Sequence, residues 1–93
     1  MRLVSLSIVF PAYNEEPNIA KAVQAAIEAG TAVASDVEVI VVNDGSRDRT
    51  KEIVLELSEK DPRVKLLDNP QNMGYGQTVW NGLRSATKEW VFF

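Results

Sequence analysis

The sequence contains no cysteine and no histidine among its 93 residues. Without cysteine there is no disulfide framework and no thiolate metal site. Without histidine, neither a Ser-His triad nor an imidazole zinc site can form within this chain. No apolar run approaches the roughly 18 residues that span a bilayer, and no signal peptide is recognisable at the start. We expect a cytoplasmic location, with membrane association only through regions absent from this chain.

The sequence also lacks an excess of positive charge. Its formal net charge is −3, and its basic residues are scattered apart from Arg47, Arg49 and Lys51. This composition gives no electrostatic reason to expect nucleic acid as a partner. With 45% apolar and 25% charged residues, the chain has the composition of one small folded domain.

Strand-like and helical patterns alternate along the chain. Residues rich in β-favouring side chains predict strands over 4–10, 37–42, 64–67 and 89–93. Apolar residues at helical spacing predict helices over 16–29, 47–59 and about 77–87. Pro11 is expected to stop the first strand, Pro17 to lie in the first helical turn, and Gly30 to stop the first helix. The order β-α-β-α-β-α-β predicts a three-layer α/β fold with a parallel sheet.

The last predicted strand is an apolar sequence, Trp90 to Phe93, at the very end of the chain. An uncapped strand of this kind has a free edge that could pair with another chain, so self-association through these residues is one expectation. We interpret residues 1–93 as the truncated N-terminal part of a longer domain.

Polar and acidic residues follow the predicted strands. In parallel sheets, ligands bind beyond the carboxyl ends of the strands, where the strand order reverses. Asp44 follows the second strand and could simply form an Asn-Asp-Gly turn, or it could accept hydrogen bonds from a base or ribose. Tyr13 could cover the core or stack on a nucleobase. The glycine-rich segment 72–76 could be a flexible turn or bind phosphate.

Taken together, these segments resemble the start of family 2 glycosyltransferases, which have the GT-A fold. The similarity lies in residues 7–15, in residues 41–46 with Asp48 and Thr50, and in residues 72–74 with Asn81 and Gly82. Asn43 stands where the family more often has a second aspartate. Within the family, the chain is most similar to dolichol-phosphate mannosyltransferases and related polyprenyl-phosphate sugar transferases.

The resemblance implies a Rossmann-like half of a GT-A fold with strand order 3-2-1-4 and a site for a nucleotide-diphosphate sugar, UDP- or GDP-linked. It implies a nucleotide-sugar site made by Pro11, Ala12, Tyr13, Glu15, Asp44, Asn72 and Gly74. It also implies a lipid-phosphate or other acceptor for the sugar.

A divalent metal, Mg or Mn, is implied for the full-length enzyme. In the family the metal-binding Asp-x-Asp lies just past the fourth strand, and this sequence reaches only Phe93. We therefore expect no catalytic residue and no metal ligand within residues 1–93, and we expect the isolated fragment to be inactive.

Two other classes remain as alternatives. A phospho-acceptor receiver domain would use Glu15, Glu16 and Asp68 at similar strand ends. A stand-alone nucleotide-binding or interaction module would use the free strand at residues 90–93. A nicotinamide-binding enzyme is disfavoured, because no glycine fingerprint follows the first strand.

Overall fold

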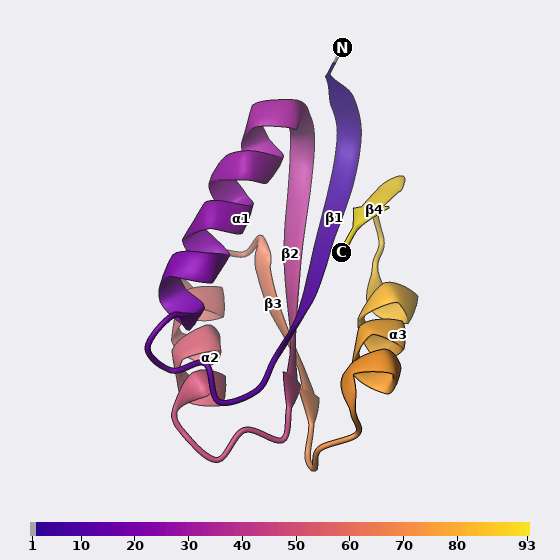
Figure 1. Ribbon diagram of the computed structural model, residues 1–93. Coiled ribbons are helices and arrows are strands. Elements are labelled where there is room, and N and C mark those ends of the chain that lie inside the picture. The colour runs from indigo at the N-terminus through magenta and orange to yellow at the C-terminus, as the bar shows by residue number, and fades with distance from the viewer. Residues whose placement is uncertain (1) are drawn as a thin grey trace.

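The computed structural model describes residues 2–93 and has seven regular elements. The strands are β1 (Leu3–Ala12), β2 (Ala34–Asp44), β3 (Val64–Asn69) and β4 (Trp90–Phe92). The helices are α1 (Ile19–Val33), α2 (Thr50–Lys60) and α3 (Tyr75–Ser85). Strands and helices alternate along the chain (Figure 1). This order confirms the predicted α/β class.

The four strands form one sheet in the order β3-β2-β1-β4. Every neighbouring pair is parallel, as the pairs Ile8–Val39 and Ile8–Phe92 illustrate. The predicted strand order 3-2-1-4 is therefore confirmed. The order reverses between β1 and β4, which is where an open parallel sheet has its ligand crevice.

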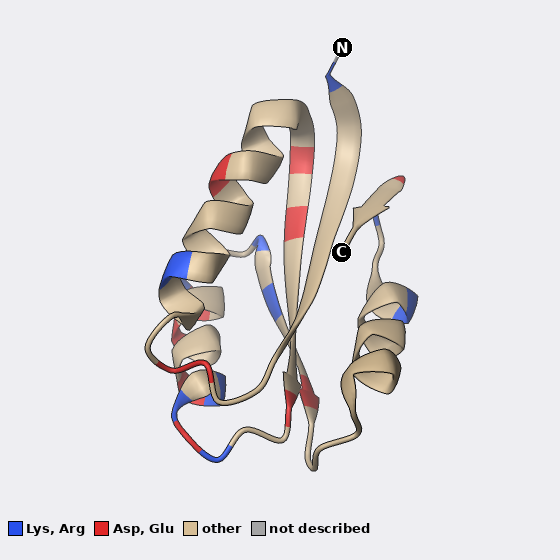
Figure 2. Cartoon of the chain, viewed as in Figure 1, with Lys and Arg blue, Asp and Glu red and all other residues tan. Residues whose placement is uncertain are grey.

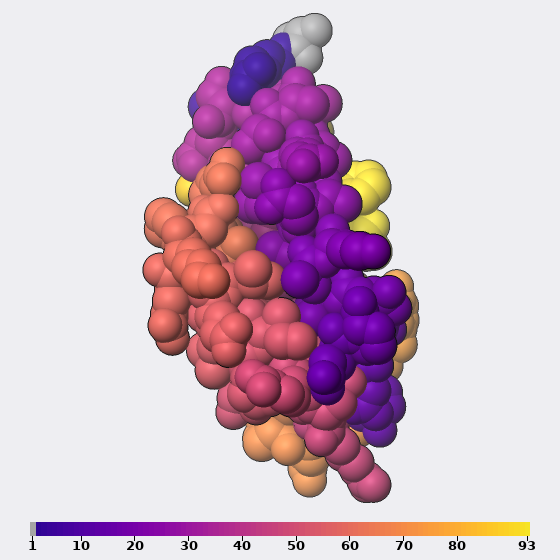
Figure 3. Space-filling view, turned by 90° about the vertical axis from the view of Figure 1, so that its left-hand side faces the viewer, coloured from indigo at the N-terminus to yellow at the C-terminus, as the bar shows by residue number. Residues whose placement is uncertain are grey.

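Helices cover the sheet on both faces. Helices α1 and α2 lie side by side on one face, where they form a continuous surface (Figures 1 and 3), and α3 lies on the other. The main apolar core lies beneath α1 and α2 and includes Val39, Val41 and Val54, none of which is exposed. Alternating side chains of β2 are buried on opposite faces, as expected for a strand with helices on both sides.

Pro11 does not stop β1. The strand continues through Pro11 to Ala12, and Pro11 pairs with Val42 of β2. Proline has no backbone N–H to donate, so a central strand with neighbours on both sides disfavours it. Here β4 pairs with β1 only as far as Ile8, so Pro11 has a neighbour on one side. The prediction was wrong because proline can continue a strand at a position where no neighbouring strand needs its N–H.

The first helix begins and ends later than predicted. Pro17 lies in the turn before α1, and Gly30 lies inside the helix. A Cβ atom at Gly30 would lie only 2.9 Å from Val37 Cγ1 and 3.0 Å from Ile8 Cδ1. Gly30 therefore permits close packing of the helix on the sheet, which is a different role from the expected helix stop.

Candidate functional site

The loops that follow the first three strands meet at one end of the sheet. They enclose a cavity of about 460 Å³ with Pro11, Ala12, Tyr13 and Glu15 on one side and Asp44, Asn72 and Gly74 on another. These are all of the residues that the family resemblance assigned to a nucleotide-sugar site. Tyr75 also lines the cavity, and sequence reasoning had given it no role. Acidic segments lie at this end of the sheet, where β2 and β3 finish (Figure 2).

Asp44 holds the loop that follows β3. Its Oδ1 accepts hydrogen bonds from Met73 N at 2.7 Å and from Asn69 Nδ2 at 3.2 Å, and its Oδ2 accepts one from Gly74 N at 3.2 Å. Burial, the strongest influence, raises the pKa of this carboxyl, but the bonds from Met73, Asn69, Thr78 and Gly74 together hold the pKa below its ordinary value. Asp44 is therefore ionised near neutral pH.

Asn69, at the end of β3, supports Asp44 from inside the protein. Its amide nitrogen donates to Asp44 Oδ1 and to Thr78 Oγ1, each at 3.2 Å, and its Oδ1 accepts from Asn81 Nδ2 at 3.4 Å. Asn69 and Thr78 are both buried. The sequence analysis gave Asn69 no function. A polar residue at the carboxyl end of a buried strand was the available signal.

Two loops on the opposite side of the cavity are tied to each other. Asn14 donates its backbone N–H to Ser46 Oγ at 2.9 Å, and its Oδ1 accepts from Arg47 N at 2.8 Å. Glu15 N donates to Thr50 Oγ1 at 2.9 Å, and Glu16 N donates to Asp48 Oδ2 at 3.1 Å. These contacts fix the segment that carries Tyr13, whose side chain is 45% exposed beside the cavity.

Gly45 lies where the loop after β3 crosses the end of β2. It has a positive φ of 72°, and a Cβ there would lie 2.5 Å from Asn72 N and 2.7 Å from Gln71 C. The structure shows that the approaching backbone is the protein's own loop.

Asp68, the acceptor required by the receiver-domain alternative, has structural partners. Its Oδ1 accepts from Asn43 Nδ2 at 2.8 Å, and its Oδ2 lies 3.1 Å from Lys51 Nζ. Burial raises the pKa of Asp68, but the contacts with Asn43 and Lys51 outweigh it and lower the pKa. The side chain does not line the cavity that holds Tyr13 and Asp44.

Within residues 2–93, no cluster of three or more acidic side chains is placed to hold a metal ion. The residues present therefore do not fit a bound divalent metal on their own. None of the helices described is long and apolar enough to cross a bilayer.

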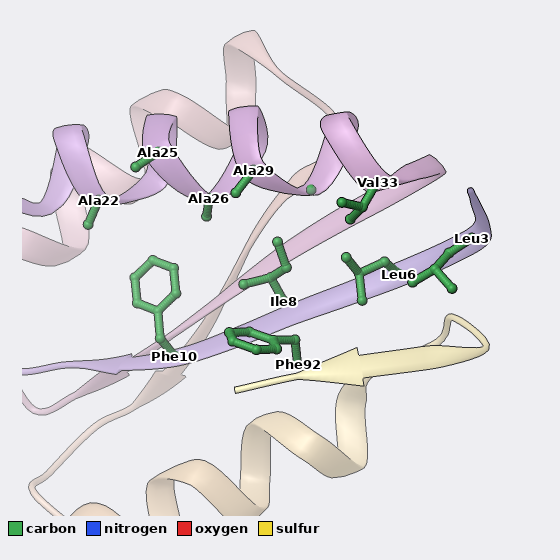
Figure 4. Close-up of a pocket in the computed structure, with 11 residues that line it drawn as sticks. Leu3, Leu6, Ile8, Phe10, Ala22, Ala25, Ala26, Ala29, Val33 and Phe92 are labelled. Atoms are coloured by element: carbon green, nitrogen blue, oxygen red, sulfur yellow. The ribbon is translucent and has the colours of Figure 1, made fainter. Parts of the chain in front are cut away.

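A second hollow, of about 530 Å³, lies between α1 and the β1–β4 side of the sheet (Figure 4). Ile8 and Phe10 of β1 point toward alanines of α1, Leu6 lies toward Val33, and the ring of Phe92 from β4 lies beside β1. All of the lining residues are apolar or glycine, so this groove offers no side chain that could hydrogen-bond a nucleotide.

The model of the family described as "Glycosyl transferase family 2" matches residues 7–93. The chain belongs to this family. The receiver-domain alternative is therefore excluded, and the predicted GT-A fold agrees with the strand order observed above.

Relatives of this family 2 glycosyltransferase chain are found in eukaryotes and bacteria. It is 39% identical over 93 residues to the dolichyl-phosphate β-glucosyltransferase ALG5A of Trichomonas vaginalis, with 95% of this chain and 29% of the relative covered. It is 40% identical over 85 residues to the uncharacterised glycosyltransferase YkcC of Bacillus subtilis, with 91% of this chain and 26% of the relative covered. The chain thus spans less than a third of these relatives.

Solved structures show the same fold. The mannosyltransferase PcManGT of Pyrobaculum calidifontis, in complex with GDP-Man and Mn2+, superposes with a TM-score of 0.73 at 28% identity, covering 98% of this chain and 26% of that one. TarS of S. aureus superposes with a TM-score of 0.70 at 27% identity, covering 96% of this chain and 26% of that one.

Proposed function

We propose that residues 1–93 form the nucleotide-binding part of an enzyme that transfers a sugar from a nucleotide-diphosphate sugar to a polyprenyl phosphate. The observation that carries this proposal is the cavity at the carboxyl ends of β1 and β2, which Tyr13, Asp44 and Gly74 all line. The relation to PcManGT, determined with GDP-Man, supports the donor class, and the relation to ALG5A supports the acceptor class.

Within this site, Tyr13 offers a half-exposed aromatic ring on which a base can stack. Asp44 has a double role in the proposal. Its carboxylate fixes the loop at Met73 and Gly74, and the part of it that lines the cavity can accept a hydrogen bond from the base or ribose. Asn72 offers an amide on the same wall, where its long 3.4 Å bond to the Asp44 carbonyl oxygen is weak enough to be exchanged for a ligand contact.

A divalent metal belongs to the proposal for the full-length enzyme only. When bound, such an ion offsets the negative charge on the departing nucleoside diphosphate. Residues 2–93 hold no suitable cluster, so the isolated chain is proposed to bind nucleotide without transferring sugar. Metal-dependent transfer of labelled sugar by these 93 residues would contradict that part of the proposal.

The test is an NMR titration of the isotope-labelled chain with UDP, with GDP and with ADP. Uridine or guanosine diphosphate should shift the amide resonances of Tyr13, Asp44 and Gly74, which line one cavity. Tyr13→Ala should weaken this binding about tenfold, because a stacked base is worth about 1–3 kcal/mol. Asp44→Asn should weaken it by a similar factor and should also broaden the resonances of Met73 and Gly74, whose N–H groups lose a charged acceptor.

Asp36→Asn is the matched control for the aspartate. Asp36 lies on the same strand, β2, but its side chain is 61% exposed and it does not line the cavity. The Asp36→Asn variant should bind nucleotide as the wild type does. If UDP and GDP leave the cavity resonances unchanged, or shift residues of the groove in Figure 4 instead, the proposed site is wrong.

A further inference from the structure

Strand β4 has a sequence that does not determine its own register. Trp90, Val91, Phe92 and Phe93 are all apolar, and each is at least 41% exposed. Sliding a strand by one residue exchanges the side chains that face the two sides of the sheet. Because both sets of side chains are apolar here, such a slip would cost little buried apolar surface. Another part of the molecule must therefore specify the observed pairing of Leu6 with Trp90 and Ile8 with Phe92.

The turn before β4 supplies this specification. Thr87 donates its backbone N–H at 2.7 Å and its hydroxyl at 2.9 Å to Glu38 Oε2. The next backbone N–H, of Lys88, donates to Ser7 Oγ at 3.2 Å, and that of Glu89 donates to Ser5 Oγ at 3.0 Å. Three consecutive backbone groups are thus attached to side chains of β1 and β2.

Glu38 is the centre of this arrangement. Its side chain is only 1% exposed, and its Oε2 also accepts a hydrogen bond from Ser7 Oγ. On the other side, Glu38 Oε1 lies 2.6 Å from Lys65 Nζ of β3. Burial raises the pKa of Glu38, but the contacts with Lys65, Ser7 and Thr87 outweigh it and lower the pKa to about 2. A charged, fully bonded carboxylate therefore connects β3, β2, β1 and the turn before β4.

We infer that Glu38 is a positioning residue that sets the register of β4 against β1. The pairing with β4 ends at Ile8, three residues before Pro11 on β1. The register therefore sets how far along β1, toward the crevice at Pro11, the residues of β4 lie. A slip of one residue would move each of them by about 3.3 Å and turn its side chain to the other face. The use of this crevice for a nucleotide sugar rests on the proposed function, but the register itself does not.

NMR of the 93-residue chain tests the inference directly. Contacts between backbone protons of β1 and β4 report the register, and amide exchange reports the stability of each strand pair. In Glu38→Gln, the Leu6–Trp90 and Ile8–Phe92 contacts should weaken or be joined by a set displaced by one residue. The β4 amides should exchange about tenfold faster than in the wild type. The amides that hydrogen-bond β2 to β3 should keep their protection.

Matched variants separate positioning from general stability. Thr87→Ser keeps both donors to Glu38 and should retain the wild-type register, whereas Thr87→Val keeps the shape but loses the hydroxyl and should loosen β4. Glu56→Gln, at an exposed ion pair on α2, should change nothing in β4. If Glu38→Gln does not fold, Ser7→Ala removes the acceptor for Lys88 N and one donor to Glu38, whose carboxylate keeps its bonds from Thr87 and Lys65.

Two outcomes would overturn the inference. One is an unchanged register and unchanged β4 exchange in Glu38→Gln, or in Ser7→Ala if that variant has to replace it. The other is an equal loss of protection in every strand, which would make Glu38 a contributor to overall stability only. A titration of the wild-type chain with UDP and GDP by the same NMR method tests the proposed function separately from the register. Absence of nucleotide binding would refute the proposed function and leave the register result standing.

Discussion

The two faces of the sheet are built differently. The face under α1 and α2 is a continuous apolar cluster that extends from Leu6 through Val39 to Val64. On the face under α3, the buried apolar cluster consists of Val9, Ile40 and Val42, and buried carboxylates lie at either end of the same row of β2 side chains. One is Glu38, beside the turn before β4, and the other is Asp44, beside the loop after β3. Burial on the first face supplies stability, and hydrogen bonds on the second place the segments near the site.

The largest effect should come from the apolar face. Ile27 of α1 is 6% exposed in the main cluster, and Ile27→Ala should lower the free energy of unfolding by about 3 kcal/mol. Val33→Ala is the control, because Val33 lies on the same helix but is 47% exposed, and it should cost less than about 1 kcal/mol. Urea denaturation measures both. Equal losses for the two variants would show that this face does not supply the main stability.

The next effect concerns the packing of α3. A Cβ at Gly82 would lie 2.3 Å from Val9 Cγ1 and 2.8 Å from Val42 Cγ2. Gly82→Ala should therefore destabilise the chain by about 2 kcal/mol through overpacking, although alanine favours a helix. Gly76→Ala, on the same helix with open space around its Cβ position, should be neutral or stabilising. The denaturation midpoints of the two variants measure the difference. The prediction is wrong if Gly82→Ala is the more stable variant.

A smaller effect should appear as a pH dependence on the α3 face. The pKa of Glu38 falls from 4.5 to about 2 on folding, so its contribution to stability is complete above about pH 4.5 and is lost as the pH falls toward 2. Lowering the pH from 6 to 3 should reduce the free energy of unfolding by about 1.5 kcal/mol. This figure allows for solvent screening of the ion pair at the half-exposed Lys65. Urea denaturation of wild type and Glu38→Gln at both pH values isolates the contribution of Glu38 to the free energy of unfolding. If the difference in unfolding free energy between the two proteins is the same at both pH values, this prediction is wrong.

The smallest effect is expected at the surface. Arg49 and Glu56 form an ion pair of 3.5 Å on α2, with both side chains more than 60% exposed. Glu56→Gln should change the free energy of unfolding by less than about 0.5 kcal/mol at 0.15 M salt. A change above about 1 kcal/mol would mean that charges outside the α3 face also contribute to stability.

Local patterns in the sequence predicted the order of elements and the parallel sheet, because β-branched strands and amphipathic helices have distinct spacing. The family resemblance assigned a nucleotide-sugar site to residues that line one cavity, and their contact with a nucleotide stays a prediction. The role of Glu38 could not be predicted, since its partners Ser7, Lys65 and Thr87 come from three distant segments. The extension of β1 through Pro11 was missed for the same reason, because it rests on pairing with Val42 of the distant strand β2. Long-range contacts decide both features, and local propensity does not contain them.

The hydrogen bonds between residues 14–16 and residues 46–50 have a consequence for how this site can vary. Each backbone donor in one loop meets a side chain at a fixed position in the other, as Asn14 with Ser46 and Glu15 with Thr50. An insertion or deletion in either loop would shift every later partner and break several bonds at once. The two loops therefore form one structural unit, in which a change of length in one loop requires a compensating change in the other.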